Sequence, residues 1–363
     1  MVTHTMLRLF QPDIFSDPIP RFVSVDDTIA QAVRAILSEH YPALCTPALR
    51  IEQVRGNEIN STNVRVETEG GVFLVKRVRG SEGRAHLNRV LDIAVWLHGA
   101  GVPAAAIVPT RDGQTSMVDG DAQWCVFEFI PDGFFSGICT DELYAAGRAI
   151  GMLHRALKQI PDQLHPERTI HDQPRTLERI IHTCAERSTD WPRLFGVMTA
   201  DMLQAQWGSL RQTFAAARLR WDAMERMSTQ ACHIDLHPHN LLVRDGSVAA
   251  FLDFYAVVSG RIGTAIAFAT FKLVRQHAVH QRLVDPDDIA ERGRCFVDAV
   301  REALPLDDEV MNTMLAHTQL ELLRRICKIF SANVQRNDQR WNHVLPMHLA
   351  GLVEAETIFR FIR

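Results

Sequence analysis

The chain has 363 residues, of which 47% are hydrophobic, 23% charged and 7% aromatic, and its formal net charge is −4. This is the composition of an ordinary globular protein, and the length is sufficient for two lobes. Because the chain carries no basic excess, neither nucleic acid nor an anionic membrane surface is expected as a partner.

The cysteines and the N-terminus predict a cytoplasmic protein. The seven cysteines are scattered and include no C-x-x-C pair, which favours reduced thiols over disulfides or a zinc site. The first residues lack the charged segment, apolar run and small-residue cleavage site of a signal peptide. The apolar runs are also shorter than the ~20 residues that a membrane span requires.

The first half of the chain predicts a short extension followed by a small sheet. Residues 1–47 are expected to form an N-terminal extension with a helix at about 27–39, where apolar residues recur at helical spacing. Residues 48–130 are expected to form a nucleotide-binding lobe. Alternating apolar and polar residues indicate its strands, and apolar spacing followed by two glycines and a proline indicates one helix, near 84–98. The strands are expected near 49–55, 63–68, 72–78, 116–118 and 122–130.

The second half, residues 131–363, predicts a larger and mainly helical lobe. Amphipathic spacing indicates helices near 141–158, 173–187, 197–225, 287–304, 309–331 and 341–361. A strand-rich island at 229–254 interrupts these helices. A small sheet followed by a large helical part is an α+β arrangement, and a cleft is expected where the two parts meet.

The most informative segment lies in the strand-rich island. It runs Cys232-His233-Ile234-Asp235-Leu236-His237-Pro238-His239-Asn240, followed by an apolar strand, a turn and then Phe251-Leu252-Asp253-Phe254. At these residues the chain resembles the aminoglycoside phosphotransferase, choline kinase and homoserine kinase type II group, over roughly residues 50–275. The resemblance implies a two-lobed protein-kinase-like fold. It also implies that ATP and Mg²⁺ are used to phosphorylate a hydroxyl group of a small molecule.

The spacing of the polar residues suits this chemistry. Phosphoryl transfer requires a carboxylate near the attacking oxygen and metal ligands that hold the phosphates. Asp235 is expected to accept or orient the substrate hydroxyl as the catalytic base. Asn240 and Asp253 are expected to bind Mg²⁺, a hard cation that prefers oxygen ligands. By resemblance, His233 braces the loop rather than contacting substrate.

The small lobe supplies the expected nucleotide-binding residues. Lys76 interrupts the apolar strand 72–78, and a buried lysine needs a partner, here the phosphates of ATP. The alternative is that Lys76 occupies the exposed side of a half-buried strand. Ser61 and Thr62 are expected to contact the phosphates, although such residues also form ordinary turns. Glu128 and Ile130 precede Pro131 and are expected to bind adenine through their backbone, or else simply to end a strand.

Two departures from the family pattern concern acidic residues. The helix after Lys76 has no glutamate in its middle, so the lysine's partner is Glu82, Asp92 or neither. About ten residues after Asp253, where relatives have a second aspartate, the stretch 259–265 contains no acid, and Thr264 is the candidate to take its place. These departures keep open the alternative of an inactive, nucleotide-binding pseudokinase. The joint presence of Lys76, Asp235, Asn240 and Asp253 argues against it.

The acceptor is expected to be a small molecule, because no proline occurs between Asp253 and Pro286 to build a peptide-docking segment. An amino alcohol, an amino acid, a sugar and an aminoglycoside all remain open. Acidic clusters at 285–288 and 307–309 are candidate walls for a polycation. The basic residues Arg324, Arg325 and Lys328 are instead candidates for receiving an anion.

A metal-dependent hydrolase is a further alternative. His233, Asp235, His237 and His239 are dense enough to ligate zinc. That interpretation leaves Lys76, Asn240 and Asp253 without a role, so the kinase interpretation is favoured.

Overall fold

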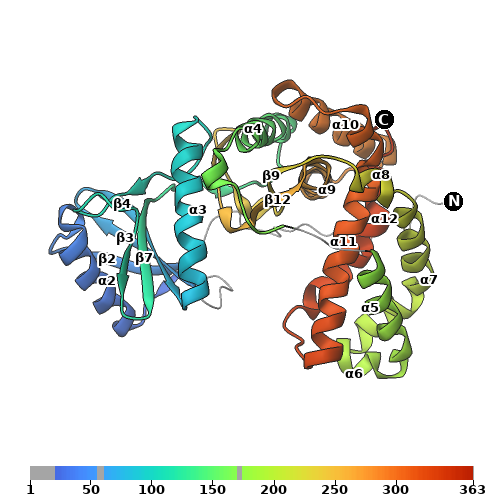
Figure 1. The fold of residues 1–363 in the computed structure, drawn as a ribbon, viewed down its shortest axis with the longest axis horizontal. Helices are drawn as coiled ribbons and strands as arrows, with labels where there is room; N and C mark the ends of the chain where they lie inside the picture. Colours follow the sequence, from blue (N-terminus) through green and yellow to red (C-terminus); the bar gives the residue numbers. More distant parts are fainter. Residues whose placement is uncertain (1–20, 55–60, 170–173, 363) are drawn as a thin grey trace.

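Two lobes lie side by side in the computed structural model, which describes residues 21–54, 61–169 and 174–362 (Figure 1). The smaller lobe holds the N-terminal strands, and the larger one holds the helices from α4 onward. Helix α3 (Ser81–Gly99) stands on the side of the small lobe that faces the large lobe. The predicted α+β, two-lobed arrangement is confirmed.

An antiparallel sheet forms the small lobe. Among the described residues its strands follow the order β1-β2-β3-β4-β7-β5, and β6 also pairs with β7. Their bounds are β1 Phe22–Ser24, β2 Arg50–Val54, β3 Ser61–Thr68, β4 Gly71–Arg79, β5 Ile107–Val108, β6 Met117–Asp119 and β7 Ala122–Glu128.

Helices cover both faces of this sheet. Helix α2 (Asp27–His40) begins where the Asp26 carboxylate accepts the Thr28 N–H at 2.9 Å, and it packs on the face that carries Val64 and Val75. The stretch expected as an extension thus contributes α2 and the edge strand β1 to this lobe. Helix α3 packs on the opposite face, against Val78 and Cys125. Because side chains alternate along a strand, Lys76 shares that α3 face.

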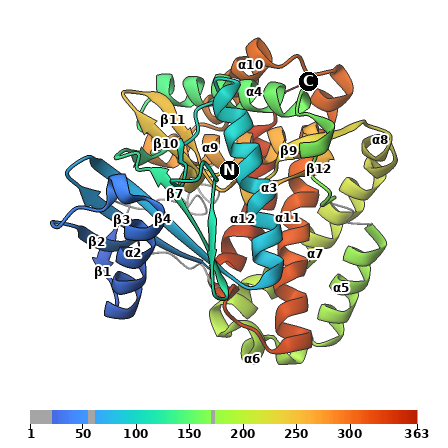
Figure 2. The ribbon, with the colours of Figure 1, turned by 60° about the vertical axis from the view of Figure 1, so that its left-hand side comes forward.

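The large lobe is built around helix α9 (Ile262–His280), of which 15 of 19 residues are buried. Around it are packed α4 (Thr140–Lys158), α10 (Pro286–Ala303), α11 (Asp308–Arg336) and α12 (Leu345–Ile358) (Figures 1 and 2). The remaining helices form an outer layer beside α11: α5 Pro174–Glu186, α6 Trp191–Phe195, α7 Val197–Leu219 and α8 Trp221–Glu225.

Two small sheets carry the loops that face the junction of the lobes. Strand β9 (Thr229–His233) pairs with β12 (Val257–Arg261), and β10 (Leu241–Arg244) pairs with both β11 (Ser247–Phe251) and β8 (Gly133–Phe134). The predicted strand-rich island therefore extends to residue 261. Within the described residues, no helix combines the length and apolar character required to cross a bilayer.

Candidate active site

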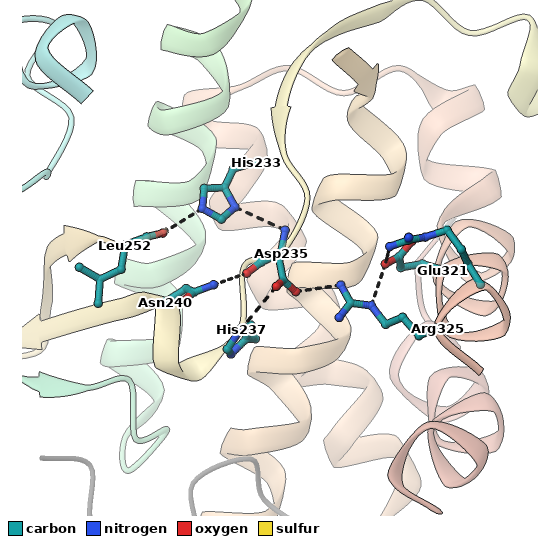
Figure 3. A network of polar contacts seen from close by, with 8 residues as sticks. His233, Asp235, His237, Asn240, Leu252, Glu321 and Arg325 are labelled. Atoms are coloured by element: carbon teal, nitrogen blue, oxygen red, sulfur yellow. Dashed lines mark hydrogen bonds and ion pairs between the residues drawn. The ribbon is translucent and has the colours of Figure 1, made fainter. Parts of the chain in front are cut away.

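His233 supports the loop that carries Asp235. Its ring is 0% exposed, and its Nε2 atom lies 3.0 Å from the Leu252 carbonyl oxygen. A carbonyl can only accept, so Nε2 carries the proton and Nδ1 accepts the Asp235 N–H at 3.4 Å (Figure 3). Burial lowers the pKa of His233, which keeps the ring in the neutral form that this arrangement requires. The predicted bracing role of His233 is confirmed.

Asn240 closes the same loop from its other end. It ends the short 3₁₀ turn Pro238–Asn240, and its Nδ2 donates to the Asp235 carbonyl oxygen at 2.8 Å. Only the amide nitrogen can donate to a carbonyl, so this bond fixes which way the side chain faces. The amide oxygen is therefore the atom that Asn240 presents as an oxygen ligand.

Asp253 lies two residues after the end of β11, and its neighbour Leu252 is bonded to this loop. The Leu252 N–H donates to the Asn240 carbonyl oxygen at 2.9 Å, while the Leu252 carbonyl accepts from His233. Asp253 itself is exposed and has left-handed backbone angles of φ 59° and ψ 54°, which an aspartate tolerates better than most residues. The predicted residues Asp235, Asn240 and Asp253 thus belong to one hydrogen-bonded frame.

The Asp235 carboxylate faces Arg325 of helix α11. Arg325 Nη2 donates to Asp235 Oδ1 at 2.8 Å, and His237 Nε2 lies 3.9 Å from Oδ2 (Figure 3). Burial alone would raise the pKa of Asp235, but the charges of Arg325 and His237 outweigh burial. The pKa of the carboxyl therefore lies well below its usual range, and Asp235 is ionised.

Glu321, one turn before Arg325 on α11, orients the arginine. It accepts from Arg325 Nε at 2.7 Å and also binds the neighbouring Arg324, although its side chain is only 2% exposed. The Arg325 guanidinium in addition lies over the Phe268 ring of α9, 4.2 Å from its centroid. A carboxylate and an aromatic ring thus hold the guanidinium against Asp235.

Lys76 meets the segment after Asp253 across the junction of the lobes. Its Nζ lies 4.9 Å from the centroid of the Tyr255 ring, and the His86 ring of α3 contacts the same tyrosine at 5.0 Å. Tyr255 belongs to the short turn Phe254–Ala256 and packs against core residues of both lobes. Of the acidic partners considered for Lys76, Asp92 is exposed, and the Glu82 side chain lies outside the described part of the chain.

The other predicted nucleotide-binding residues lie on the strands around Lys76. Ser61 and Thr62 begin β3, opposite Val78 and Arg77 of β4. Residues 55–60 of the preceding loop lie outside the described residues. Glu128 ends β7, and its N–H donates to the Ala106 carbonyl oxygen at 2.9 Å. Among the described residues, the Ile130 N–H has no hydrogen-bond acceptor, as adenine recognition through this backbone group requires.

The other polar residues that the sequence suggested contribute to the fold. Thr264 Oγ1 lies 2.9 Å from His317 Nδ1 of α11, so it joins two helices. The acidic clusters at 285–288 and 307–309 lie at the N-terminal ends of α10 and α11, where carboxylates favour helix formation. Among the described residues, no group of three or more His, Cys, Asp or Glu side chains is arranged to hold a metal ion, as the zinc alternative would need.

Sequence reasoning named Arg325 only as a candidate for an anionic acceptor and missed its contact with Asp235. The two residues lie 90 positions apart, so no local spacing could have revealed the pair. The one available signal was the spacing of Glu321, Arg324 and Arg325, which places both arginines within reach of the glutamate on a helix.

Comparison with known proteins supports the kinase interpretation. A model of the phosphotransferase enzyme family (APH) matches residues 50–276. A homoserine kinase of Gluconacetobacter diazotrophicus is 24% identical over 255 residues, which cover 69% of this chain and 71% of the relative. A homoserine kinase of Caulobacter vibrioides is 23% identical over 205 residues, covering 54% of this chain and 57% of the relative.

Solved structures share the fold at low sequence identity. Spectinomycin phosphotransferase in complex with ADP and spectinomycin has a TM-score of 0.63 at 12% identity, covering 91% of this chain and 97% of that one. Amicoumacin kinase has a TM-score of 0.60 at 15% identity, covering 93% and 96%. The chain therefore belongs to the phosphotransferase enzyme family, and its predicted function as a small-molecule kinase is confirmed.

Proposed function

We propose that this protein transfers the γ-phosphate of ATP, with Mg²⁺, to a hydroxyl group of a small molecule, and that Asp235 orients this hydroxyl. The frame joining Asp235, Asn240 and Asp253 carries the proposal. A base and two metal ligands require fixed relative positions, and the bonds through His233 and Leu252 supply them. The similarity to kinases of small molecules supports the same type of reaction.

The donor atoms fit Mg²⁺. Asn240 presents an amide oxygen whose direction is set by its bond to the Asp235 carbonyl, and Asp253 presents an exposed carboxylate. Hard oxygen donors are the ligands that Mg²⁺ prefers. When bound, Mg²⁺ would neutralise charge on the phosphate oxygens.

The remaining residues divide into nucleotide and acceptor contacts. Lys76 on β4 would bind the phosphates, with Ser61 of β3 on the same face of the sheet. Thr62 pairs with Arg77 on the opposite face, so its backbone and not its side chain would contribute. The Glu128 carbonyl oxygen and the Ile130 N–H would hold adenine. Asp235, ionised through its contact with Arg325, would orient the acceptor hydroxyl and receive its proton as the oxygen–phosphorus bond forms.

The substrates named for related kinases suggest which class of small molecule this chain phosphorylates. Homoserine kinases act on a hydroxyl amino acid, and an aminopropanol kinase is among the similar folds. Because the acidic clusters lie at the ends of α10 and α11, the described residues favour an amino acid or amino alcohol over a polycationic aminoglycoside.

An ATP-consumption screen against hydroxyl amino acids, amino alcohols, sugars and aminoglycosides tests the proposal. We expect Mg²⁺-dependent ATP consumption with one acceptor class and formation of its phosphate ester. If the protein binds nucleotide in the presence of Mg²⁺ yet turns over with no acceptor, the pseudokinase alternative replaces the proposal.

A further inference from the structure

We propose that Arg325 is the receptor for a carboxylate on the acceptor, and that binding of this carboxylate releases Asp235 to address the acceptor's hydroxyl. The inference rests on the proposed role of Asp235 and adds the acceptor's charge and the residue that recognises it. The two ends of the acceptor would lie at neighbouring side chains, so a small hydroxy acid or hydroxyl amino acid is the class that fits.

The position of Arg325 is the first support. Its Nη2 donates directly to Oδ1 of the residue proposed to face the hydroxyl. Helix α11 and the two side chains Glu321 and Phe268 fix the guanidinium from the other side. An arginine held this way lies beside the carboxylate proposed to face the hydroxyl, where a group on the acceptor can meet the guanidinium.

The balance of charge is the second support. Arg325 has two carboxylate partners, Asp235 and Glu321, and Glu321 also pairs with Arg324. When Asp235 turns to a neutral hydroxyl and accepts its proton, it no longer compensates the guanidinium. Arg325 then keeps only Glu321, which it shares with Arg324, and a largely buried cation that loses a carboxylate partner is destabilised. A carboxylate on the acceptor restores the balance by an exchange of ion-pair partners, in which no covalent bond forms or breaks.

The geometry of the guanidinium is the third support. Arg325 uses Nε for Glu321 and Nη2 for Asp235, and its Nη1 has no hydrogen-bond acceptor among the described residues. The side chain is 23% exposed, so this end of the guanidinium is accessible. The two Nη groups together offer the planar pair of donors that binds a carboxylate through both oxygens, which a lysine cannot imitate.

The test compares acceptors that differ only in the carboxylate. Each hydroxyl compound that drives ATP consumption is measured against its analogue without the carboxylate, for example homoserine against 3-aminopropanol and serine against ethanolamine. We expect the wild-type chain to favour the acid in kcat/KM, and Arg325→Gln to reduce this preference about 10–100-fold, mainly through KM for the acid. Arg325→Lys should recover only part of the preference.

Two controls separate recognition from folding. Arg294→Gln removes an exposed arginine of α10 whose partners are Glu291 and Asp298, so it should keep the preference for the acid. Thermal unfolding of each variant reports the effect on the fold alone.

Two outcomes would overturn the inference while leaving the kinase function intact. One is a preferred acceptor without an anionic group. The other is an Arg325→Gln variant that lowers turnover of acid and amine equally, which would make Arg325 only a brace for Asp235. Absence of turnover with every acceptor is a third and distinct result, because it would remove the proposed function together with the inference.

Discussion

At the scale of single residues, Asp235 is the most decisive position. Asp235→Asn keeps the size of the side chain but removes the charge that we propose orients the hydroxyl, and we expect kcat to fall roughly 10²–10⁴-fold with little change in ATP binding. Steady-state kinetics and nucleotide titration measure the two effects. Asp245→Asn is the matched control, since Asp245 is an exposed turn residue of the neighbouring hairpin. A variant of Asp235 with full turnover would contradict the assignment.

Asp253 permits an equally specific change. Because its φ of 59° is in the left-handed region, alanine would add backbone strain, whereas asparagine tolerates this conformation. We expect Asp253→Asn to weaken Mg²⁺-dependent binding of a non-hydrolysable ATP analogue by at least about 10-fold, because the change removes a charged oxygen from the proposed metal site. Binding measured in EDTA should change little. Equal affinity of the two proteins in the presence of Mg²⁺ would exclude Asp253 from the metal site.

A site residue could be predicted from the sequence when its partners lie close to it along the chain. Asp235, Asn240 and Asp253 could be named because they fall within 19 positions, and the bonds that join them run along and between adjacent strands. The aromatic contact of Lys76 with Tyr255 could not be named, since it joins the two lobes. Family expectation directed attention to an acid on α3, where the chain presents His86 against the same tyrosine.

At the scale of elements, the spacing of apolar residues identified the helices that bury a single face. It was less informative for the central helix α9. Helix α10 buries one side and was predicted to within a residue of its bounds. Helix α9 is buried on nearly every side, including Lys272 and Arg275, so it has no apolar stripe and was not singled out. The helices packed around α9 explain its burial, and the spacing of its own apolar residues does not.

The turn that carries Tyr255 links the two lobes, and its ring is the element that we expect to hold Lys76 in position. Tyr255→Leu should raise KM for ATP about 3–10-fold through loss of the cation–π contact, while Tyr255→Phe keeps the ring and should behave as wild type. Kinetics of both variants in a Lys76→Met background provide the check. If leucine has the same effect there, the tyrosine acts through packing and not through the lysine.

At the scale of the whole molecule, buried histidines connect the lobe's stability to pH. Burial lowers the pKa of His154 to about 4 and that of His317 to about 3, from an ordinary value of 6.5. His154 lies on α4 and His317 on α11, so the two report on different parts of the large lobe. The unfolded chain binds protons at these residues at a higher pH than the folded chain does. These two histidines therefore cost no stability above about pH 6.5, and the free energy of unfolding declines as the pH falls below that value.

Each of these histidines should remove about 2 kcal/mol from the free energy of unfolding at pH 5, because the folded state keeps the ring neutral while the unfolded state gains a proton. Urea unfolding at a series of pH values between 7 and 5 measures this slope. His154→Gln and His317→Gln should each flatten it, whatever their effect on stability at pH 7. His343→Gln, at an exposed ring, is the control for the substitution itself. A slope that survives both buried replacements would place the acid sensitivity in other groups, and these two rings would then be protonated in the folded state as readily as in the unfolded chain.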